Sequence, residues 1–143
     1  MKQCYQPTML TKGFKQLLAE AEKKAPGISA HDAQARLADP QTVFVDLRDV
    51  RELEREGMIP GAFHAPRGML EFWVDPESPY YKPVFDEKKT FILYCQADWR
   101  GVLAAATLKE MGLPNVFHLE GGYGEWRKAG LPTGPRPDKK KDG

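Results

Sequence analysis

The fold of this chain is decided by residues 91–100, which read Phe91-Ile-Leu-Tyr-Cys95-Gln-Ala-Asp-Trp-Arg100. Phe91 to Tyr94 is an apolar run with the length and composition of a buried strand. Residues 101–111 are rich in Ala and Leu, which predicts a helix buried on most sides, and Gly112 follows where a left-handed C-cap is wanted. The chain is therefore expected to pass from a buried strand, through a tight loop at Cys95, into a buried helix.

This arrangement has chemical consequences for Cys95. The loop lies over the start of the predicted helix, where the first backbone N–H groups lack intrahelical partners and the helix dipole adds partial positive charge. Arg100 adds a full positive charge at the end of the loop. A thiol in such a place is expected to ionise near neutral pH and to act as a nucleophile. The alternative is that Cys95 is a small apolar residue that ends a buried strand.

The rest of the chain alternates short strands with helices. The run 42–47 is β-branched and apolar without a clean alternation, which is typical of a parallel strand covered on both faces. The connection over residues 66–85 is too long to be structureless, so it is expected to contain helical turns or to line a site. Further strands are expected at 28, 62–65 and 116–119, and further helices at 10–24, 30–37, 50–56 and 120–129. The pattern predicts an α/β domain with a central parallel sheet of about five strands and helices on both faces.

Four short motifs, in this order along the chain, resemble those of single-domain rhodaneses. Asp46-Leu-Arg48 ends a strand where the family has Asp-Val-Arg, and Ile59-Pro-Gly-Ala62 follows it. Cys95-Gln-Ala-Asp-Trp-Arg100 resembles the active-site loop, and Gly121-Gly-Tyr-Gly-Glu-Trp126 resembles the Gly-Gly-x-x-x-Trp near the end of the family domain. The resemblance extends over roughly residues 28–132 and implies a rhodanese-like fold.

The resemblance also implies a sulfurtransferase with Cys95 as its catalytic nucleophile. The thiolate would take a sulfur from a donor such as thiosulfate and pass it from a persulfide to a thiol or cyanide acceptor; a protein could serve as donor or acceptor. No metal or organic cofactor is expected. The substrate would be bound by the loop, whose N–H groups would hold the persulfide anion. The implied binding residues are Gln96, Ala97, Asp98, Trp99 and Arg100, and the implied supporting residues are Asp46 and Arg48 below the loop and Arg67 and Lys82 at its mouth.

Loop length bears on the reaction class. Four residues separate Cys95 from Arg100, whereas the related cysteine phosphatases and arsenate reductases use five, so the cradle is expected to fit one sulfur better than a phosphate. A non-catalytic interaction module that kept the fold is the other alternative. Asp98 stands where many members of the family have Gly. An inward-facing carboxylate there would oppose an anionic donor, so we expect Asp98→Gly to raise turnover with thiosulfate.

Length and charge limit what else the chain can do. With 143 residues it is long enough for one domain, and a net charge of +1 does not argue for nucleic acid. No stretch is apolar enough to span a membrane or to act as a secretory signal, and two cysteines make no disulfide framework, so a cytoplasmic protein is expected. The three histidines lack metal-ligand spacing.

We expect a helical extension over 1–26 with a free thiol at Cys4, a rhodanese-like domain over 27–132, and a disordered basic tail over 133–143.

Overall fold

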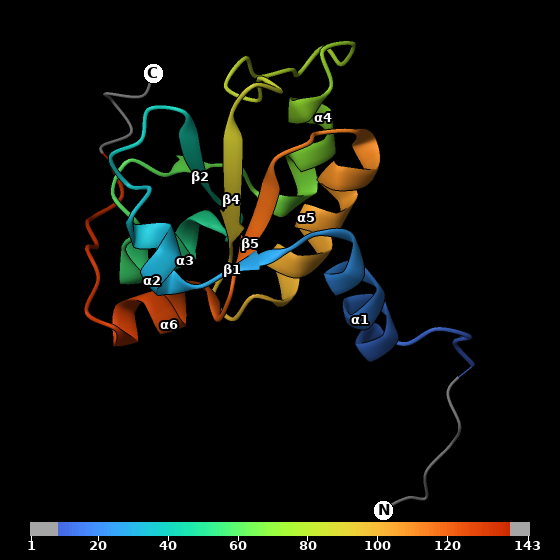
Figure 1. The fold of residues 1–143 in the computed structure, drawn as a ribbon, viewed down its shortest axis with the longest axis horizontal. Coiled ribbons are helices and arrows are strands. Elements are labelled where there is room, and N and C mark those ends of the chain that lie inside the picture. Colours follow the sequence, from blue (N-terminus) through green and yellow to red (C-terminus); the bar gives the residue numbers. More distant parts are fainter. Residues whose placement is uncertain (1–8, 138–143) are drawn as a thin grey trace, which may run out of the picture.

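A computed structural model describes residues 9–137 and shows the expected parallel sheet (Figure 1). Five strands lie in the order β1-β5-β4-β2-β3, and every pair of neighbours is parallel. The strands are β1 (Gly27–Ile28), β2 (Thr42–Asp46), β3 (Phe63–His64), β4 (Thr90–Tyr94) and β5 (Val116–Leu119). The predicted fold class is therefore confirmed, with β4, the strand that leads to Cys95, at the centre of the sheet.

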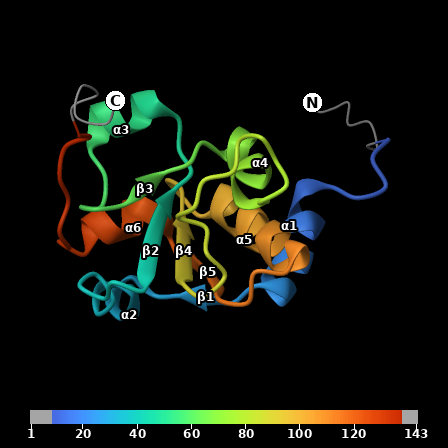
Figure 2. The same cartoon turned by 90° about the horizontal axis from the view of Figure 1, so that it is seen from above.

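Helices cover both faces of this sheet. Figure 2 shows two groups of helices, one on each side of the strands. One group consists of α1 (Phe14–Lys24), α4 (Leu70–Val74) with the short 3-10 helix η1 (Arg67–Met69) before it, and α5 (Trp99–Met111). The other group consists of α2 (Ala30–Gln34), α3 (Val50–Glu56) and α6 (Gly122–Lys128).

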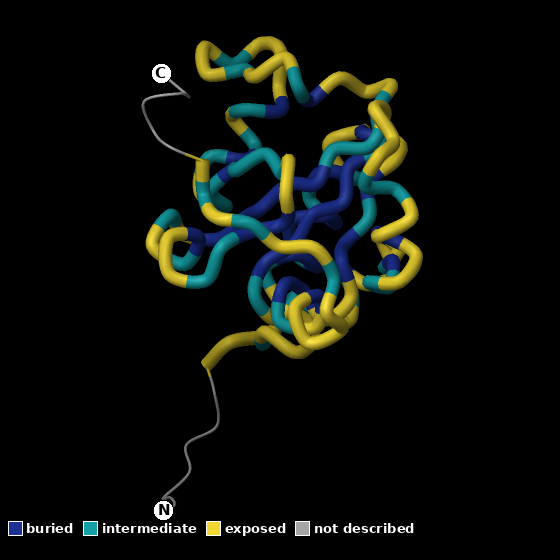
Figure 3. Tube along the Cα trace, turned by 90° about the vertical axis from the view of Figure 1, so that its left-hand side faces the viewer, coloured by how far each residue is buried: buried dark blue, intermediate teal, exposed yellow. Residues whose placement is uncertain are grey.

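The alternation of side chains along β4 builds a core on each side of the sheet. Phe91 and Leu93 belong to the apolar cluster that contains α4 and α5, whereas Ile92 and Tyr94 belong to the cluster that contains α6. All four are fully buried, and the strands form the dark interior in Figure 3. Burying each such side chain stabilises the fold by about 1.5–3 kcal/mol. An apolar residue is therefore required on both faces, which explains why this run does not alternate in polarity.

Parallel pairing brings the carboxyl ends of the strands to one edge of the sheet. Asp46 in β2 is in register with Tyr94 in β4, and Leu93 is in register with His118 in β5. The residues that follow these strands therefore meet at this edge, which is where open α/β sheets place their ligands. The motifs that begin at Asp46, Cys95 and Gly121 are brought together in this way.

The segments outside the family resemblance are partly ordered. Helix α1 starts at Phe14, later than predicted, and packs Leu18 and Ala21 against α5. The predicted tail begins with structure, because Gly134 exchanges two backbone hydrogen bonds with Met58, of 2.8 and 2.9 Å. The first residues of the predicted tail therefore contact the domain through Gly134. Cys4 and residues 138–143 lie outside the described residues.

Within residues 9–137, no helix is both long and apolar enough to cross a membrane.

Candidate active site

Cys95 directly follows β4, and its residue is 1% exposed. The chain then turns through residues 96–98 and enters α5 at Trp99. Across the described part of the chain, the backbone N–H groups of residues 96–100 donate to no protein acceptor. Five successive amide donors next to a thiol form a site that can hold an anion.

Two carbonyl groups of this loop are turned toward α6. The carbonyl of Cys95 accepts the Tyr123 N–H at 2.8 Å, and the carbonyl of Gln96 accepts the Gly124 N–H at 3.0 Å. In a planar trans peptide the N–H points away from the C=O. The N–H groups that follow these carbonyls, on Gln96 and residue 97, therefore point away from α6.

The Gly121-Gly122 turn makes this contact possible. Both glycines have positive φ, of 77° and 63°. A Cβ atom on Gly122 would lie 2.5 Å from the carbonyl oxygen of Cys95, so only glycine allows α6 to approach the loop this closely. The Gly-Gly-x-x-x-Trp motif thus places the start of α6 against the cysteine loop.

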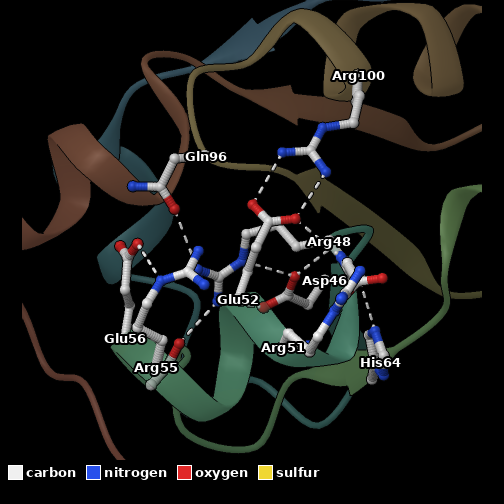
Figure 4. Close-up of polar contacts among 11 residues, drawn as sticks. Asp46, Arg48, Arg51, Glu52, Arg55, Glu56, His64, Gln96 and Arg100 are labelled. Atoms are coloured by element: carbon white, nitrogen blue, oxygen red, sulfur yellow. Dashed lines mark hydrogen bonds and ion pairs between the residues drawn. The ribbon is translucent and has the colours of Figure 1, made fainter.

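Arg48 and Asp46 form a buried ion pair beneath the loop, with both side chains fully buried. Arg48 donates to Asp46 through its Nε at 3.0 Å and its Nη2 at 2.8 Å, and its guanidinium lies 4.2 Å from the centre of the Tyr123 ring. Its Nη1 donates to Oε1 of Gln96 at 3.1 Å, a contact that Figure 4 shows. Burial lowers the pKa of Arg48, but the bonds and charge of Asp46 outweigh it and raise the pKa. The structure therefore brings two of the four predicted supporting residues, Asp46 and Arg48, to the loop, and Arg48 contacts it directly.

Arg100 pairs with a residue of α3. Its Nη1 and Nη2 donate to the two carboxylate oxygens of Glu52 at 3.0 and 3.1 Å (Figure 4). These bonds raise the pKa of Arg100; burial opposes the rise, and the nearby Cys95 adds to it. Glu52 also accepts the Asp49 N–H at 3.0 Å, which caps α3. Although Arg48 and Glu52 are only four residues apart in the sequence, Arg48 pairs with Asp46 and Glu52 pairs with Arg100 of the cysteine loop.

The Asp98 carboxylate is turned toward β5. Asp98 has a φ of 79°, and its Oδ2 lies 2.8 Å from Nδ1 of His118. Its Oδ1 is buried and accepts no hydrogen bond from the described residues. Burial raises the pKa of the Asp98 carboxyl, whereas the His118 bond acts in the opposite direction. The sequence led us to expect that an inward-facing Asp98 carboxylate would oppose an anionic donor; in the structure this carboxylate contacts His118 instead.

The remaining loop residues are more exposed. Trp99 is 60% exposed, and its ring packs on that of Phe14 in α1, with the ring centres 5.0 Å apart. Residue 97 is also exposed. Trp99 therefore joins the loop to the helix that precedes the family domain.

Arg67 and Lys82 lie in different places. The Arg67 backbone N–H donates to the carbonyl of Leu47, so Arg67 lies near the carboxyl end of β2. Its side chain pairs with Glu71 at 2.9 Å. The Lys82 ammonium lies 5.0 Å from the centre of the Trp73 ring. Its segment leads to the start of β4, at the end of the sheet opposite the Cys95 loop (Figure 1). The structure does not bring Lys82 to the loop.

Comparison with known proteins agrees with this geometry. The model of the rhodanese-like domain matches residues 29–129. The chain belongs to the rhodanese-like domain family. A solved Rhodopseudomonas palustris protein of unknown function, described as a possible tyrosine phosphatase, is 48% identical, with a TM-score of 0.86 over 91% of this chain and 100% of that one. The polysulfide-sulfur transferase homodimer of Wolinella succinogenes is 29% identical, with a TM-score of 0.69 over 88% of this chain and 90% of that one.

A curated relative, the tRNA uridine(34) hydroxylase of Erwinia tasmaniensis, is 34% identical over 114 residues. The match covers 74% of this chain but only 31% of that protein. The rhodanese-like chain thus spans about a third of the length of this curated relative.

Sequence reasoning missed two residues of the rhodanese-like site. Glu52 was not among the predicted site residues, and His118 was considered only as one of three histidines without metal-ligand spacing. The one available signal for His118 was the acidic residue at position 98, which has to find a partner once buried. Among residues 9–137, no group of three or more His, Cys, Asp or Glu could hold a metal ion.

Proposed function

We propose that this chain is a sulfurtransferase that carries a sulfane sulfur on Cys95. One observation supports this most strongly: the amide N–H groups of residues 96–100 are free of protein acceptors in the described part of the chain and follow directly on a buried cysteine. These donors suit a single anionic sulfur attached to Sγ. Membership of the rhodanese-like family and the likeness to a polysulfide-sulfur transferase add support.

The reaction has two half-reactions. In the first, the Cys95 thiolate attacks the outer sulfur of thiosulfate; a new S–S bond forms on Sγ, the S–S bond of thiosulfate breaks, and sulfite leaves with the electron pair. In the second, a thiolate or cyanide attacks the outer sulfur of the persulfide, and the Cys95 thiolate is released. The protein alternates between two covalent forms, so ping-pong kinetics are expected. A polysulfide or a protein persulfide would react in the same way: the leaving group would be the shortened polysulfide anion in the first case and the donor protein's thiolate in the second.

Mass spectrometry tests this proposal directly. After incubation with thiosulfate or polysulfide and removal of the excess, the intact protein should gain about 32 Da, the mass of one sulfur, and cyanide should remove it. The Cys95→Ser variant should gain nothing under the same conditions. A wild-type protein that takes up no sulfur from either donor would exclude the proposal and favour a non-catalytic interaction module.

A phosphatase is the second candidate, because the Rhodopseudomonas palustris relative is described as a possible tyrosine phosphatase. The four-residue spacing between Cys95 and Arg100 argues against a phosphatase. Both terminal nitrogens of Arg100 also donate to Glu52, so they are not free to bind a phosphate. Hydrolysis of p-nitrophenyl phosphate by the wild type, lost in Cys95→Ser, would reverse this order. The hydroxylase activity named for the curated relative is not proposed for this chain, since the chain matches only 31% of that protein.

A further inference from the structure

We propose that His118 is a positioning residue for sulfur transfer, which holds the Cys95 loop in its left-handed turn through the side chain of Asp98. The inference rests on the function proposed above. The hydrogen bond between this histidine of β5 and this aspartate of the loop maintains a backbone conformation that glycine would adopt without support.

The turn at Asp98 needs such help. Asp98 is the only residue other than glycine with positive φ among residues 9–137. A side chain disfavours the left-handed region, although Asp tolerates it better than most residues. Asp98 also starts α5, since its carbonyl accepts the Val102 N–H at 2.8 Å. A different φ at Asp98 would therefore turn the Cys95 loop away from the helix and misalign its amide donors.

His118 is placed to hold this residue from below. Its register with Leu93 puts it on the face of the sheet that α5 covers, and its side chain is 4% exposed. Its Nδ1 lies 2.8 Å from Oδ2 of Asp98. This contact joins the loop to a strand of the central sheet.

Gly101 completes the arrangement. A Cβ atom on Gly101 would lie 2.8 Å from Oδ1 of Asp98, so the carboxylate fits against α5 only because residue 101 has no side chain. Asp98, Gly101 and His118 therefore match one another in shape as well as in hydrogen bonding. A carboxylate that only capped a surface loop would need neither the gap nor the buried partner.

The charges around His118 favour the pair. Burial lowers the pKa of His118, but the bond and charge of Asp98, together with Glu22 of α1 and Glu120 after β5, raise it above the ordinary value. Without the histidine, the Asp98 carboxylate would be buried and unpaired. The loop would then move to bring that carboxylate to water.

A double-mutant cycle tests the inference. We expect His118→Leu to lower kcat for sulfur transfer at least about tenfold with little change in KM, because the donors to the persulfide are misaligned. Asp98→Gly removes both the buried carboxylate and the need for support. Adding His118→Leu to Asp98→Gly should therefore change kcat by less than about twofold. A double variant in which His118→Leu still has its full effect would overturn the proposal, as would a fully active His118→Leu single variant.

Two further variants separate positioning from loss of folding. His118→Asn puts an amide donor near the position of Nδ1 and should restore most of kcat, whereas a role in general packing would leave it impaired. His31→Leu, an exposed histidine on α2, is the matched control and should behave as the wild type.

The outcome stays readable if the chain transfers no sulfur at all. Alkylation of Cys95 by iodoacetamide reports on the loop without any sulfur donor. The pH of half-maximal alkylation should rise in His118→Leu and should differ little between Asp98→Gly and the double variant. If sulfur loading fails while this order holds, only the proposed function is lost; if the order fails while loading succeeds, only the role of His118 is lost.

Discussion

The positive charge of Arg100 is already paired with the Glu52 carboxylate in the protein without substrate. Glu52 accepts hydrogen bonds from both terminal nitrogens of the Arg100 guanidinium. The Glu52 side chain is 20% exposed, so the pair lies at the rim of the loop. In the proposed reaction, an anionic donor would compete with this carboxylate for Arg100. The negative charge that would oppose thiosulfate there is that of Glu52 on α3, whereas the Asp98 carboxylate is paired with His118.

Glu52→Gln should strengthen the binding of thiosulfate. The amide oxygen can still accept a hydrogen bond from Arg100 and cap α3, so the loop stays in place while one negative charge is removed. We expect KM for thiosulfate to fall by about two- to fivefold, the range for one partly exposed ion pair. Steady-state kinetics measure this, with Glu54→Gln on the same helix as the control. A higher KM in Glu52→Gln would show that Glu52 assists the donor.

At the level of elements, the cysteine loop is held from three directions. The segment that follows β2 contributes Arg48 under Gln96, strand β5 contributes His118 under Asp98, and the start of α6 donates to the loop carbonyls. Each contact uses a different part of the loop. The loop is therefore supported at several points along its length by neighbouring elements.

The contact with α6 can be tested with two glycines. Gly122→Ala places a Cβ atom against the carbonyls of the loop. Gly130 also has a positive φ, of 75°, but a Cβ atom there would have no neighbour within 4 Å. Both alanine variants should lose about 1–2 kcal/mol from the left-handed backbone. Only Gly122→Ala should lose more stability and also sulfur loading of Cys95, as measured by urea unfolding and intact mass. Equal effects of the two changes would contradict the support role of α6.

For the whole molecule, the site couples stability to pH. A group whose pKa rises on folding stabilises the fold below its unfolded pKa, and this contribution is lost as the pH rises through the folded pKa. His118 is such a group, with an ordinary pKa of 6.5. Glu52 has the opposite sign: its bond to Arg100 lowers its pKa, so its contribution is present above 4.5 and is lost in acid.

Urea unfolding across pH checks the contribution of the histidine. As the pH rises above about 6.5, the free energy of unfolding of the wild type should fall relative to that of His118→Asn, whose side chain does not titrate. The two proteins should run parallel over this range if His118 is not paired in the folded state, and that result would remove the electrostatic part of the argument.

The sequence by itself determined the order of the elements and the place of Cys95. Apolar runs of strand length, an Ala-rich helix and glycine or proline at the breaks are local signals, and they predicted α3 and β5 at their observed bounds. The Gly-Gly-x-x-x-Trp motif was also visible, although its contact with the cysteine loop was not. Local signals were sufficient here because each depends on residues only a few positions apart.

Only the tertiary structure decided which side chains meet around Cys95. Glu52 and Arg100 are 48 residues apart, and Asp98 and His118 are 20 apart, so no periodicity relates them. Lys82 resembled a residue of the site by its place in the chain, yet its segment turns toward the start of β4. The pairing of parallel strands decides which side chains meet, because it brings the carboxyl ends of strands that are distant in sequence to one edge of the sheet. The segments that lead into the strands, such as that of Lys82, then lie at the opposite edge.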